Sequence, residues 1–206
     1  METAIILPND GYLRGCLPKD LFKSLLDEAL TSRNHLTRET GVVDIHGDQT
    51  CPHYDVSDEM SQKLMQVLSP KFDEYNQEFG YYKTVKVHNS PSPIIFAQPW
   101  YNLQSPNDFL PSHGHGGILS YTVWLKLPKL SEFIFYYNSA AGGGILQHHL
   151  KLTPDHAGEY IIFPSRLQHA VLPFKSDDPD EIRISLSGNI FFQGVEDYKS
   201  RLNKFT

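Results

Sequence analysis

A chain of 206 residues, 40% of them apolar and 12% aromatic, has the size and composition of one globular domain with a substantial core. Its formal charge of −6 provides no basic surface for nucleic acid, and no apolar run approaches the roughly 18 residues of a membrane-spanning helix. Cys16 and Cys51 are too few for a disulfide framework or a thiolate metal cluster. We therefore predict one soluble, cytoplasmic domain over residues 1–206, with no membrane as its partner and no indication that it binds nucleic acid.

Residues 1–80 are predicted to be mainly helical. After Pro18, apolar residues recur at helical spacing and form one stripe, which comprises Leu21, Leu25, Leu26, Ala29 and Leu30. A second helix is expected to begin near Ser57, because the two acidic residues that follow favour the N-terminal end of a helix, and to reach Gly80 with an interruption at Pro70. The polar segment between the helices is assigned to loops, together with its three histidines, His35, His46 and His53.

The hydrophobic period becomes strand-like from Tyr81 onward, where β-branched and aromatic residues lie between glycines and prolines. The predicted strands are 84–88, 94–103, 119–127, 132–137, 145–152, 159–163, 169–172 and 182–192. Short strands with no helix between them indicate an antiparallel sandwich or barrel, whose mouth can hold a small ligand. Residues 81–192 therefore form the expected core, and residues 193–206 a C-terminal helix or tail.

A histidine pair in the segment Pro111–Gly117 indicates metal binding. His113 and His115 are separated by one residue, so an extended backbone points both imidazoles to the same side. Neutral imidazole binds iron, zinc, copper and nickel, and a third imidazole from a distant strand would complete one face of the coordination sphere. His169, which opens a later strand, is the predicted third ligand, and the opposite face would stay open for catalysis.

Arg183 is predicted to form an anion site near these histidines. It lies on an apolar strand, where it alternates with Ser185 onto one face, and a buried charge there must be paired. Its planar fork suits a carboxylate held by two parallel hydrogen bonds. The alternative is a salt bridge to an internal acid, either Glu181 or Glu159.

In the order and spacing of these residues, the chain resembles the iron(II)- and 2-oxoglutarate-dependent oxygenases. More narrowly, it is similar to the small prolyl-hydroxylase-like oxygenases of marine bacteriophages. The resemblance covers roughly residues 95–192, and residues 1–80 add only a compatible shape. The phrases that carry it jointly are Trp100–Asn102, Pro111–Gly117, Ser120–Pro128, Gly158–His169 and Arg183–Asn189.

This resemblance implies an α+β, mainly β fold: a double-stranded β-helix, or jelly-roll barrel, with the N-terminal helices packed against it. It also implies iron(II) as cofactor and 2-oxoglutarate as co-substrate, which is converted to succinate and carbon dioxide while a substrate is hydroxylated. The implied metal ligands are His113, His115 and His169. The implied contacts with 2-oxoglutarate are Arg183, Ser185, Tyr101 and Asn102.

One residue departs from the family pattern, because His115 stands where the usual triad of two histidines and one carboxylate has Asp or Glu. Three interpretations follow. The three histidines bind the metal together; or Asp108 supplies a carboxylate from the preceding loop; or the metal is weakly bound or absent. A neutral ligand in place of an anionic one leaves the site one charge unit more positive.

The predicted function is therefore that of a 2-oxoglutarate-dependent dioxygenase that hydroxylates a small-molecule or peptidyl substrate, in the host cytoplasm if the chain comes from a phage. Two alternatives belong to other classes: a cupin-like three-histidine metal protein that does not use 2-oxoglutarate, and a non-enzymatic jelly-roll binding module. Arg183 discriminates against the first, because a cupin-type site needs no carboxylate clamp. Open strand edges also allow a homo-oligomer.

Overall fold

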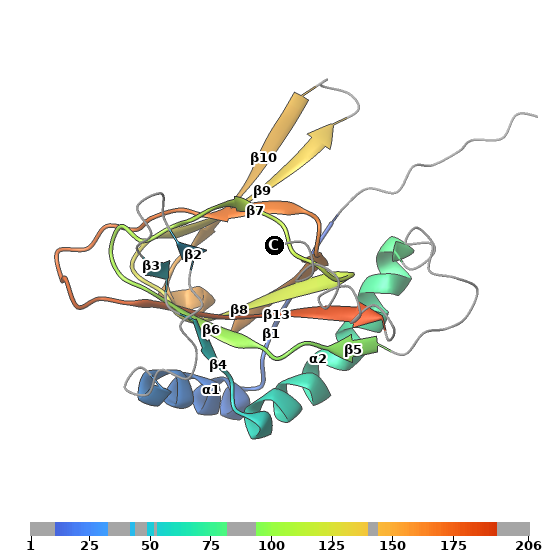
Figure 1. Cartoon of the computed structure of the whole chain (residues 1–206), viewed down its shortest axis with the longest axis horizontal. Helices are drawn as coiled ribbons and strands as arrows, with labels where there is room; N and C mark the ends of the chain where they lie inside the picture. Colours follow the sequence, from blue (N-terminus) through green and yellow to red (C-terminus); the bar gives the residue numbers. More distant parts are fainter. Residues whose placement is uncertain are drawn as a thin grey trace, which may run out of the picture.

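Two antiparallel sheets pack face to face in the computed structural model, and helices α1 (Lys19–Ser32) and α2 (Asp58–Phe79) lie against the outer face of the larger sheet (Figure 1). The structure describes residues 11–32, 42–43, 49–51, 53–81, 94–139 and 144–192. The arrangement is a mainly β jelly roll with N-terminal helices packed on it, so the predicted fold class is confirmed.

Both helices form where apolar stripes predict them. The hydroxyl of Ser57 accepts a hydrogen bond from the Met60 backbone N–H (3.3 Å) at the start of α2, and Gly80 ends the helix with φ 60°. The expected interruption at Pro70 is wrong, because the helix continues through it. Buried residues on both sides of Pro70 hold the two halves of α2 against the sheet, and their burial offsets the roughly 3 kcal/mol that an internal proline costs. These buried residues are Leu64, Leu68, Phe72 and Tyr75.

The larger sheet has the strand order β1-β11-β8-β13-β6-β4, and β5 also pairs with β13. Its neighbouring strands are antiparallel. The strands are β1 (Leu13–Cys16), β4 (His53–Asp55), β5 (Ile94–Phe96), β6 (Trp100–Gln104), β8 (Leu119–Lys126), β11 (Glu159–Pro164) and β13 (Arg183–Phe192). Strands β1 and β4 were not predicted, since strands this short give no periodic signal.

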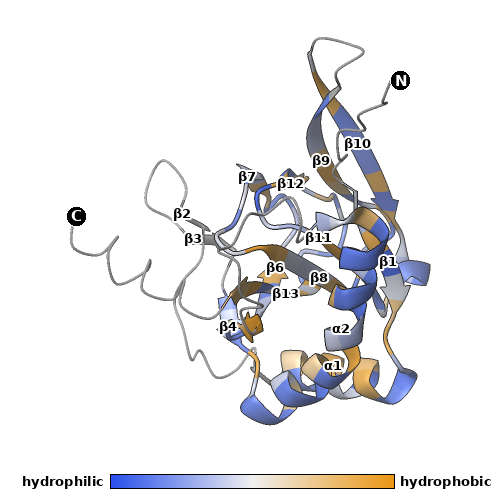
Figure 2. Cartoon of the chain, turned by 90° about the vertical axis from the view of Figure 1, so that its right-hand side faces the viewer, coloured by the Kyte–Doolittle hydropathy of each residue, from blue (hydrophilic) through white to orange (hydrophobic). Residues whose placement is uncertain are grey.

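The smaller sheet has the order β10-β9-β12-β7 and is also antiparallel. Its strands are β7 (Leu110–His113), β9 (Ser131–Ser139), β10 (Gly144–Leu152) and β12 (Gln168–Val171). The β9–β10 hairpin projects from the barrel (Figures 1 and 2). Strand β7 was not predicted, because a short segment containing a proline lacks apolar alternation. Three further elements complete the described fold: strands β2 (Val42–Val43) and β3 (Gln49–Cys51), which pair with each other, and a 3-10 helix at Pro154–His156.

Strand alternation separates outward from inward side chains. On β13, Ile184 and Leu186 belong to the core shared with the helices, whereas Arg183 and Ser185 line a cavity inside the barrel. The inner core around that cavity is largely aromatic and includes Trp124, Phe133, Phe135 and Phe163. Polar inward residues on β13 therefore mark where the barrel interior is open to a ligand.

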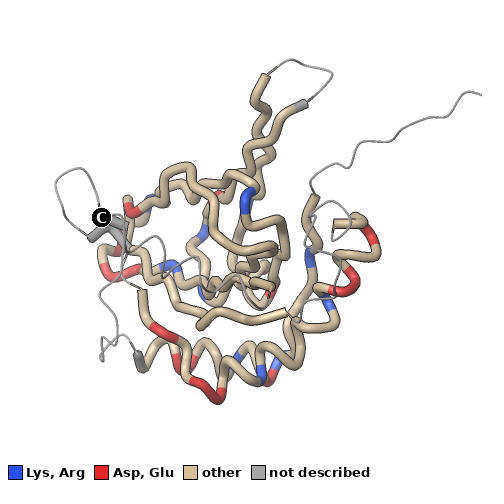
Figure 3. The backbone as a smooth tube through the Cα atoms, turned by 45° about the vertical axis from the view of Figure 1, so that its right-hand side comes forward, with Lys and Arg blue, Asp and Glu red and all other residues tan. Residues whose placement is uncertain are grey.

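Two predicted elements, the strand 84–88 and the C-terminal helix or tail over 193–206, lie outside the described residues. Neither described helix is long and apolar enough to cross a membrane. Acidic and basic residues are interspersed along the helices (Figure 3), and Lys63 Nζ pairs with Glu59 Oε1 (2.6 Å) one turn away on α2. The exposed side of the helix layer thus carries charges of both signs.

Candidate metal centre

Three imidazoles converge at one end of the cavity. His113 is the last residue of β7 and lies opposite His169 of β12 in the antiparallel register. His115 follows in the loop and is held there by a hydrogen bond from its backbone N–H to the Ser165 carbonyl (2.7 Å). One ring nitrogen of each histidine lies within 4.8 Å of the others, and the Nε2 atoms of His115 and His169 are 3.2 Å apart. The structure brings together the three residues selected from the sequence.

Glycines allow the segment Pro111–Gly117, called the metal loop below, to pack closely against its neighbours. Gly117 has φ 101°, and a Cβ there would lie 2.5 Å from the Ile190 carbonyl oxygen. A Cβ on Gly114, between the two histidines, would come 2.8 Å from Gln168 Nε2. The glycine-rich composition of the segment Pro111–Gly117 therefore follows from the close approach of this loop to the rest of the barrel.

Hydrogen bonds and burial keep the imidazoles ready to bind a cation. Carbonyl oxygens accept from the Nδ1 atoms of His113 (Pro111, 2.7 Å) and His169 (Leu167, 2.8 Å), so each Nε2 presents its lone pair to the cluster. Burial lowers the pKa of His169 to about 3, against the opposing hydrogen bond to Leu167, and lowers the pKa of His115 to about 4. Neutral, convergent nitrogens of this kind fit a divalent transition metal that has positions left open for other ligands.

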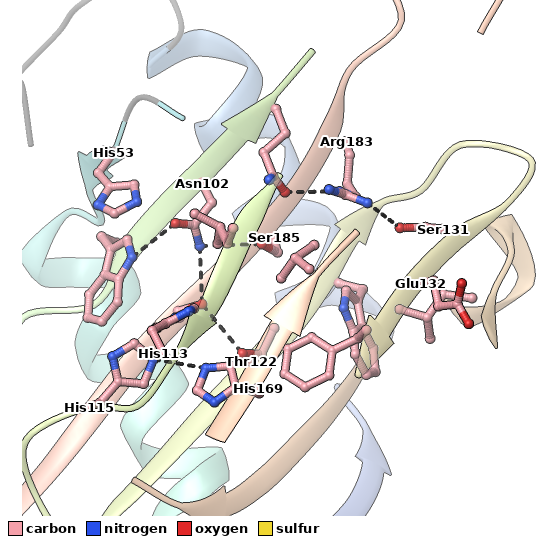
Figure 4. Close-up of a pocket in the computed structure, with 18 residues that line it drawn as sticks. His53, Asn102, His113, His115, Thr122, Ser131, Glu132, His169, Arg183 and Ser185 are labelled. Carbon is pink, nitrogen blue, oxygen red and sulfur yellow. Dashed lines mark hydrogen bonds between the residues drawn. The ribbon is translucent and has the colours of Figure 1, made fainter. Parts of the chain in front are cut away.

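The other end of the same cavity contains the guanidinium of Arg183 (Figure 4). This side chain is 2% exposed and lies over the Phe174 ring, 5.2 Å from its centroid. Its Nε donates to Gln104 Oε1 (2.9 Å), and its Nη1 donates to the Ser131 hydroxyl (2.6 Å) and the Leu172 carbonyl (2.9 Å). These three acceptors are neutral and orient the guanidinium. An acid also senses its charge: burial raises the pKa of the Asp108 carboxyl, and the Arg183 charge opposes that shift.

Polar side chains of β6 and β13 line the cavity between its two ends, and the cavity encloses about 210 Å³. Asn102 Nδ2 donates to the hydroxyls of Ser185 (3.3 Å) and Ser187 (3.1 Å). Asn102 Oδ1 accepts from the Trp100 indole N–H (3.1 Å), and the Trp100 ring lies 6.2 Å from the His115 ring. The strand register forms three rungs from the buried cation toward the metal cluster: Arg183 with Gln104, Ser185 with Asn102, and Ser187 with Trp100.

The structure corrects the roles expected for Tyr101 and Asp108. Tyr101 is fully buried on the helix-facing side of β6, where its hydroxyl donates to Glu28 Oε1 (2.9 Å), and burial together with that carboxylate raises its pKa. Strand alternation turns it away from the cavity that Asn102 faces. Asp108 accepts a hydrogen bond from the Ser105 backbone N–H (2.7 Å) and closes a turn outside the histidine cluster. Tyr101 is therefore no co-substrate contact, and Asp108 no metal ligand, in this arrangement.

One salt bridge weighed from the sequence is also ruled out by the packing. Glu159 lies at the start of β11 and pairs with Arg14 on β1, with Oε2 2.7 Å from Nε and 2.5 Å from Nη2. The carboxylate of Glu159 is therefore engaged on the outer edge of the larger sheet, away from the cavity that contains Arg183.

Several residues that line the cavity were given no role from the sequence, and three of them border the assigned site: His53, Trp100 and Gln104. His53, which was assigned to a loop, lies on β4 with its ring 6.0 Å from that of Trp100. Trp100 and Gln104 were not given a role either. The signal for both was present in the alternation of Trp100, Asn102 and Gln104 along one strand, which places all three on the same face. His53 offered no such signal, because only the pairing of β4 with β6 brings it to the cavity.

A jelly roll with an open three-histidine face at one end of its cavity and a buried guanidinium at the other has the features of a metal-dependent enzyme that takes an anionic co-substrate. Residues 98–189 match a family model described as "Putative 2OG-Fe(II) oxygenase". This part of the chain is a 2OG-Fe(II) oxygenase domain, with iron(II) as its metal and 2-oxoglutarate as its co-substrate. The resemblance to the iron(II)- and 2-oxoglutarate-dependent oxygenases is therefore confirmed.

Solved structures share the fold over most of the chain. A prolyl-4-hydroxylase from Pseudomonas putida has a TM-score of 0.62 at 18% identity, over 89% of this chain and 94% of its own. The epimerase SnoN from nogalamycin biosynthesis has a TM-score of 0.60 at 14% identity, over 89% and 77%. A viral collagen prolyl hydroxylase from Paramecium Bursaria Chlorella virus-1, in complex with 2-oxoglutarate, has a TM-score of 0.53 at 16% identity, over 87% and 94%. A search of curated proteins gives no match.

Proposed function

We propose that the chain is a hydroxylase, in which His113, His115 and His169 hold the iron and Arg183 binds the remote carboxylate of 2-oxoglutarate. The bound iron and co-substrate would supply the oxidation, in which one atom of O₂ enters a substrate C–H bond and the other enters succinate. The observation that carries the proposal is a single cavity with neutral imidazoles at one end and a buried cation at the other.

The charge of the site supports a dianionic co-substrate. Three neutral imidazoles leave the two positive charges of a ferrous ion uncompensated, and Arg183 adds a third at the far end of the cavity. A chelating 2-oxo dicarboxylate brings two negative charges, one to each end. An acid in place of His115 would remove one positive charge from the metal end. The departure from the usual triad therefore strengthens the attraction of the site for a dianion.

Ser185 and Asn102 are assigned to the middle of the cavity with different roles. Because Asn102 donates to the Ser185 oxygen, the Ser185 hydroxyl keeps its own proton for an acceptor in the cavity. Asn102 is itself oriented by the Trp100 indole, which occupies its carbonyl oxygen. We assign Ser185 as a direct donor to the co-substrate and Asn102 as the residue that orients it.

The substrate is assigned to the side of the cavity where His53 and Trp100 border His115. These rings come from neighbouring strands of the larger sheet and line the cavity beside the metal cluster. A small molecule or the side chain of a peptide, placed against them, would present a C–H bond to the open face of the metal. Two of the similar structures are prolyl hydroxylases and one is an epimerase, so the product distinguishes the chemistry.

Binding and product analysis test the proposal in two stages. In anaerobic Mn(II)-loaded protein, Arg183→Ala should weaken 2-oxoglutarate binding by more than about 100-fold, because a charge-paired carboxylate loses its partner. Arg183→Lys keeps the charge but loses the fork, and Arg14→Ala removes an arginine from the outer edge of the sheet as the matched control. Unchanged affinity in Arg183→Ala would remove Arg183 from its assigned role.

The second stage uses Fe(II)-loaded protein, ¹⁸O₂ and a panel of peptides and small molecules. A hydroxylase transfers one labelled atom to the product that accompanies succinate, which mass spectrometry detects as a heavier product. An epimerised or desaturated product without label, formed with succinate, would contradict hydroxylation while leaving 2-oxoglutarate dependence intact.

A further inference from the structure

We propose that Gln104 is a second binding residue for the remote carboxylate of the co-substrate, and that its amide N–H selects a 2-oxo dicarboxylate over a 2-oxo monocarboxylate. This inference rests on the proposed function, in which the Arg183 end of the cavity receives that carboxylate. It adds a neutral donor to a site otherwise defined by one cation.

The orientation of the Gln104 amide follows from the chemistry of its neighbour. Gln104 Oε1 lies 2.9 Å from Arg183 Nε, and a guanidinium has donors only. The amide oxygen must therefore face Arg183, since the opposite orientation would place two N–H donors against each other. Nε2 therefore lies on the far side of the amide from Arg183.

The Nε2 group has no acceptor in the described part of the chain. Gln104 is 1% exposed, it lines the cavity, and its Nε2 is buried without a hydrogen-bond partner. A buried, unsatisfied donor costs about 1–3 kcal/mol, so a position of this kind is retained at a cost to the fold. An acceptor that enters the cavity at this end would recover that cost.

The neighbouring amide of Asn102 shows, by contrast, that an amide on this face of β6 can have partners at both ends. Asn102 lies two residues away on the same face of β6, and both ends of its amide have partners in Ser185, Ser187 and Trp100. The donor capacity of Gln104 is thus open where Arg183 supplies a positive charge. A carboxylate has two oxygens, which can accept from the guanidinium and from the amide together.

The test compares two ligands that differ only at the remote end. 2-Oxopentanoate has the five carbons of 2-oxoglutarate but a methyl group in place of the remote carboxylate. Gln104→Leu should weaken 2-oxoglutarate binding to anaerobic Mn(II)-loaded protein by about 10- to 100-fold, which is the range for a hydrogen bond to a charged group. The affinity for 2-oxopentanoate should change less than about threefold. Both tryptophans of the chain line this cavity, so intrinsic fluorescence reports binding without turnover.

A second variant keeps the test decisive if Gln104→Leu does not fold. Gln104→Glu preserves the shape and places an anion beside Arg183, so it should weaken 2-oxoglutarate more than 2-oxopentanoate. Gln62→Leu and Gln62→Glu, at an exposed position on α2, are the matched controls. Equal losses for the two ligands, or unchanged 2-oxoglutarate affinity in both Gln104 variants, would overturn the inference. If the wild-type protein itself binds no 2-oxoglutarate, the proposed function fails first.

Discussion

Tyr101→Phe separates a structural role from a co-substrate role on strand β6. The substitution removes the hydroxyl that donates to Glu28 Oε1 (2.9 Å) between the sheet and α1. A hydrogen bond to a charged group contributes about 1.5–3 kcal/mol. Glu28 keeps the Ser57 backbone N–H (2.9 Å) and hydroxyl (2.6 Å) as donors, so we expect the lower end of that range. For a chain of this size, about 1.5 kcal/mol lowers the Tm by roughly 3–6 °C.

The assay is a thermal melt paired with a 2-oxoglutarate titration of the Mn(II)-loaded protein. We expect Tyr101→Phe to lower the Tm and to leave the affinity for 2-oxoglutarate within about twofold, since the ring faces the helices. Tyr137→Phe is the matched control, because Tyr137 is 40% exposed on the β9–β10 hairpin and its loss should change stability by less than about 0.5 kcal/mol. An unchanged Tm together with weakened 2-oxoglutarate binding would refute the assignment of Tyr101 to the core.

Three further predictions concern the metal loop and its histidines. His169→Ala should abolish stoichiometric Fe(II) binding measured by metal analysis, whereas His148→Ala, on the exposed strand β10, should retain it; equal occupancy would exclude His169 as a ligand. The pKa of His169 is about 3, below the usual value of about 6.5, so the unfolded state binds more protons between these values and metal-free protein should lose stability as the pH falls below 6.5. Thermal melts in EDTA from pH 7 to 5 should show a smaller loss of stability for His169→Phe than for the unchanged protein. An equal loss of stability would contradict the assignment of this pH dependence to His169. Gly117→Ala should destabilise the protein by about 1–3 kcal/mol, because φ is 101° and the Ile190 carbonyl is close, while Gly144→Ala, with nothing within 4 Å of its Cβ, should not; equal melts for the two would argue against strain at Gly117.

The ligand pattern was predictable because it is largely local. His113 and His115 are two residues apart, and the segment Pro111–Gly117 forms a tight loop on any barrel that brings it next to the third imidazole. His169 was selected as the histidine that opens a later strand, and its register opposite His113 follows from the antiparallel pairing of β7 with β12. Family resemblance supplied the chemistry that spacing alone leaves open.

The co-substrate end was only partly predictable. Arg183 and Ser185 were placed on one face by alternation, and both line the cavity. Tyr101 and Asn102 were proposed together, although adjacent strand residues face opposite ways and only one of them can reach the cavity. Strand β6 is buried on both faces, so its sequence does not tell which side meets the helices and which meets the ligand.

The helices, most of the strands and the types of residue that could bind iron and a carboxylate follow from local sequence, because hydrophobic period and residue chemistry are local properties. Which side chains meet depends on the tertiary structure. It placed Gln104 beside Arg183, 79 positions apart, brought His53 to the cavity through an edge strand, and turned Tyr101 toward the helices. These outcomes depend on strand register and on which face of each strand is covered, and both are set by pairing between distant segments.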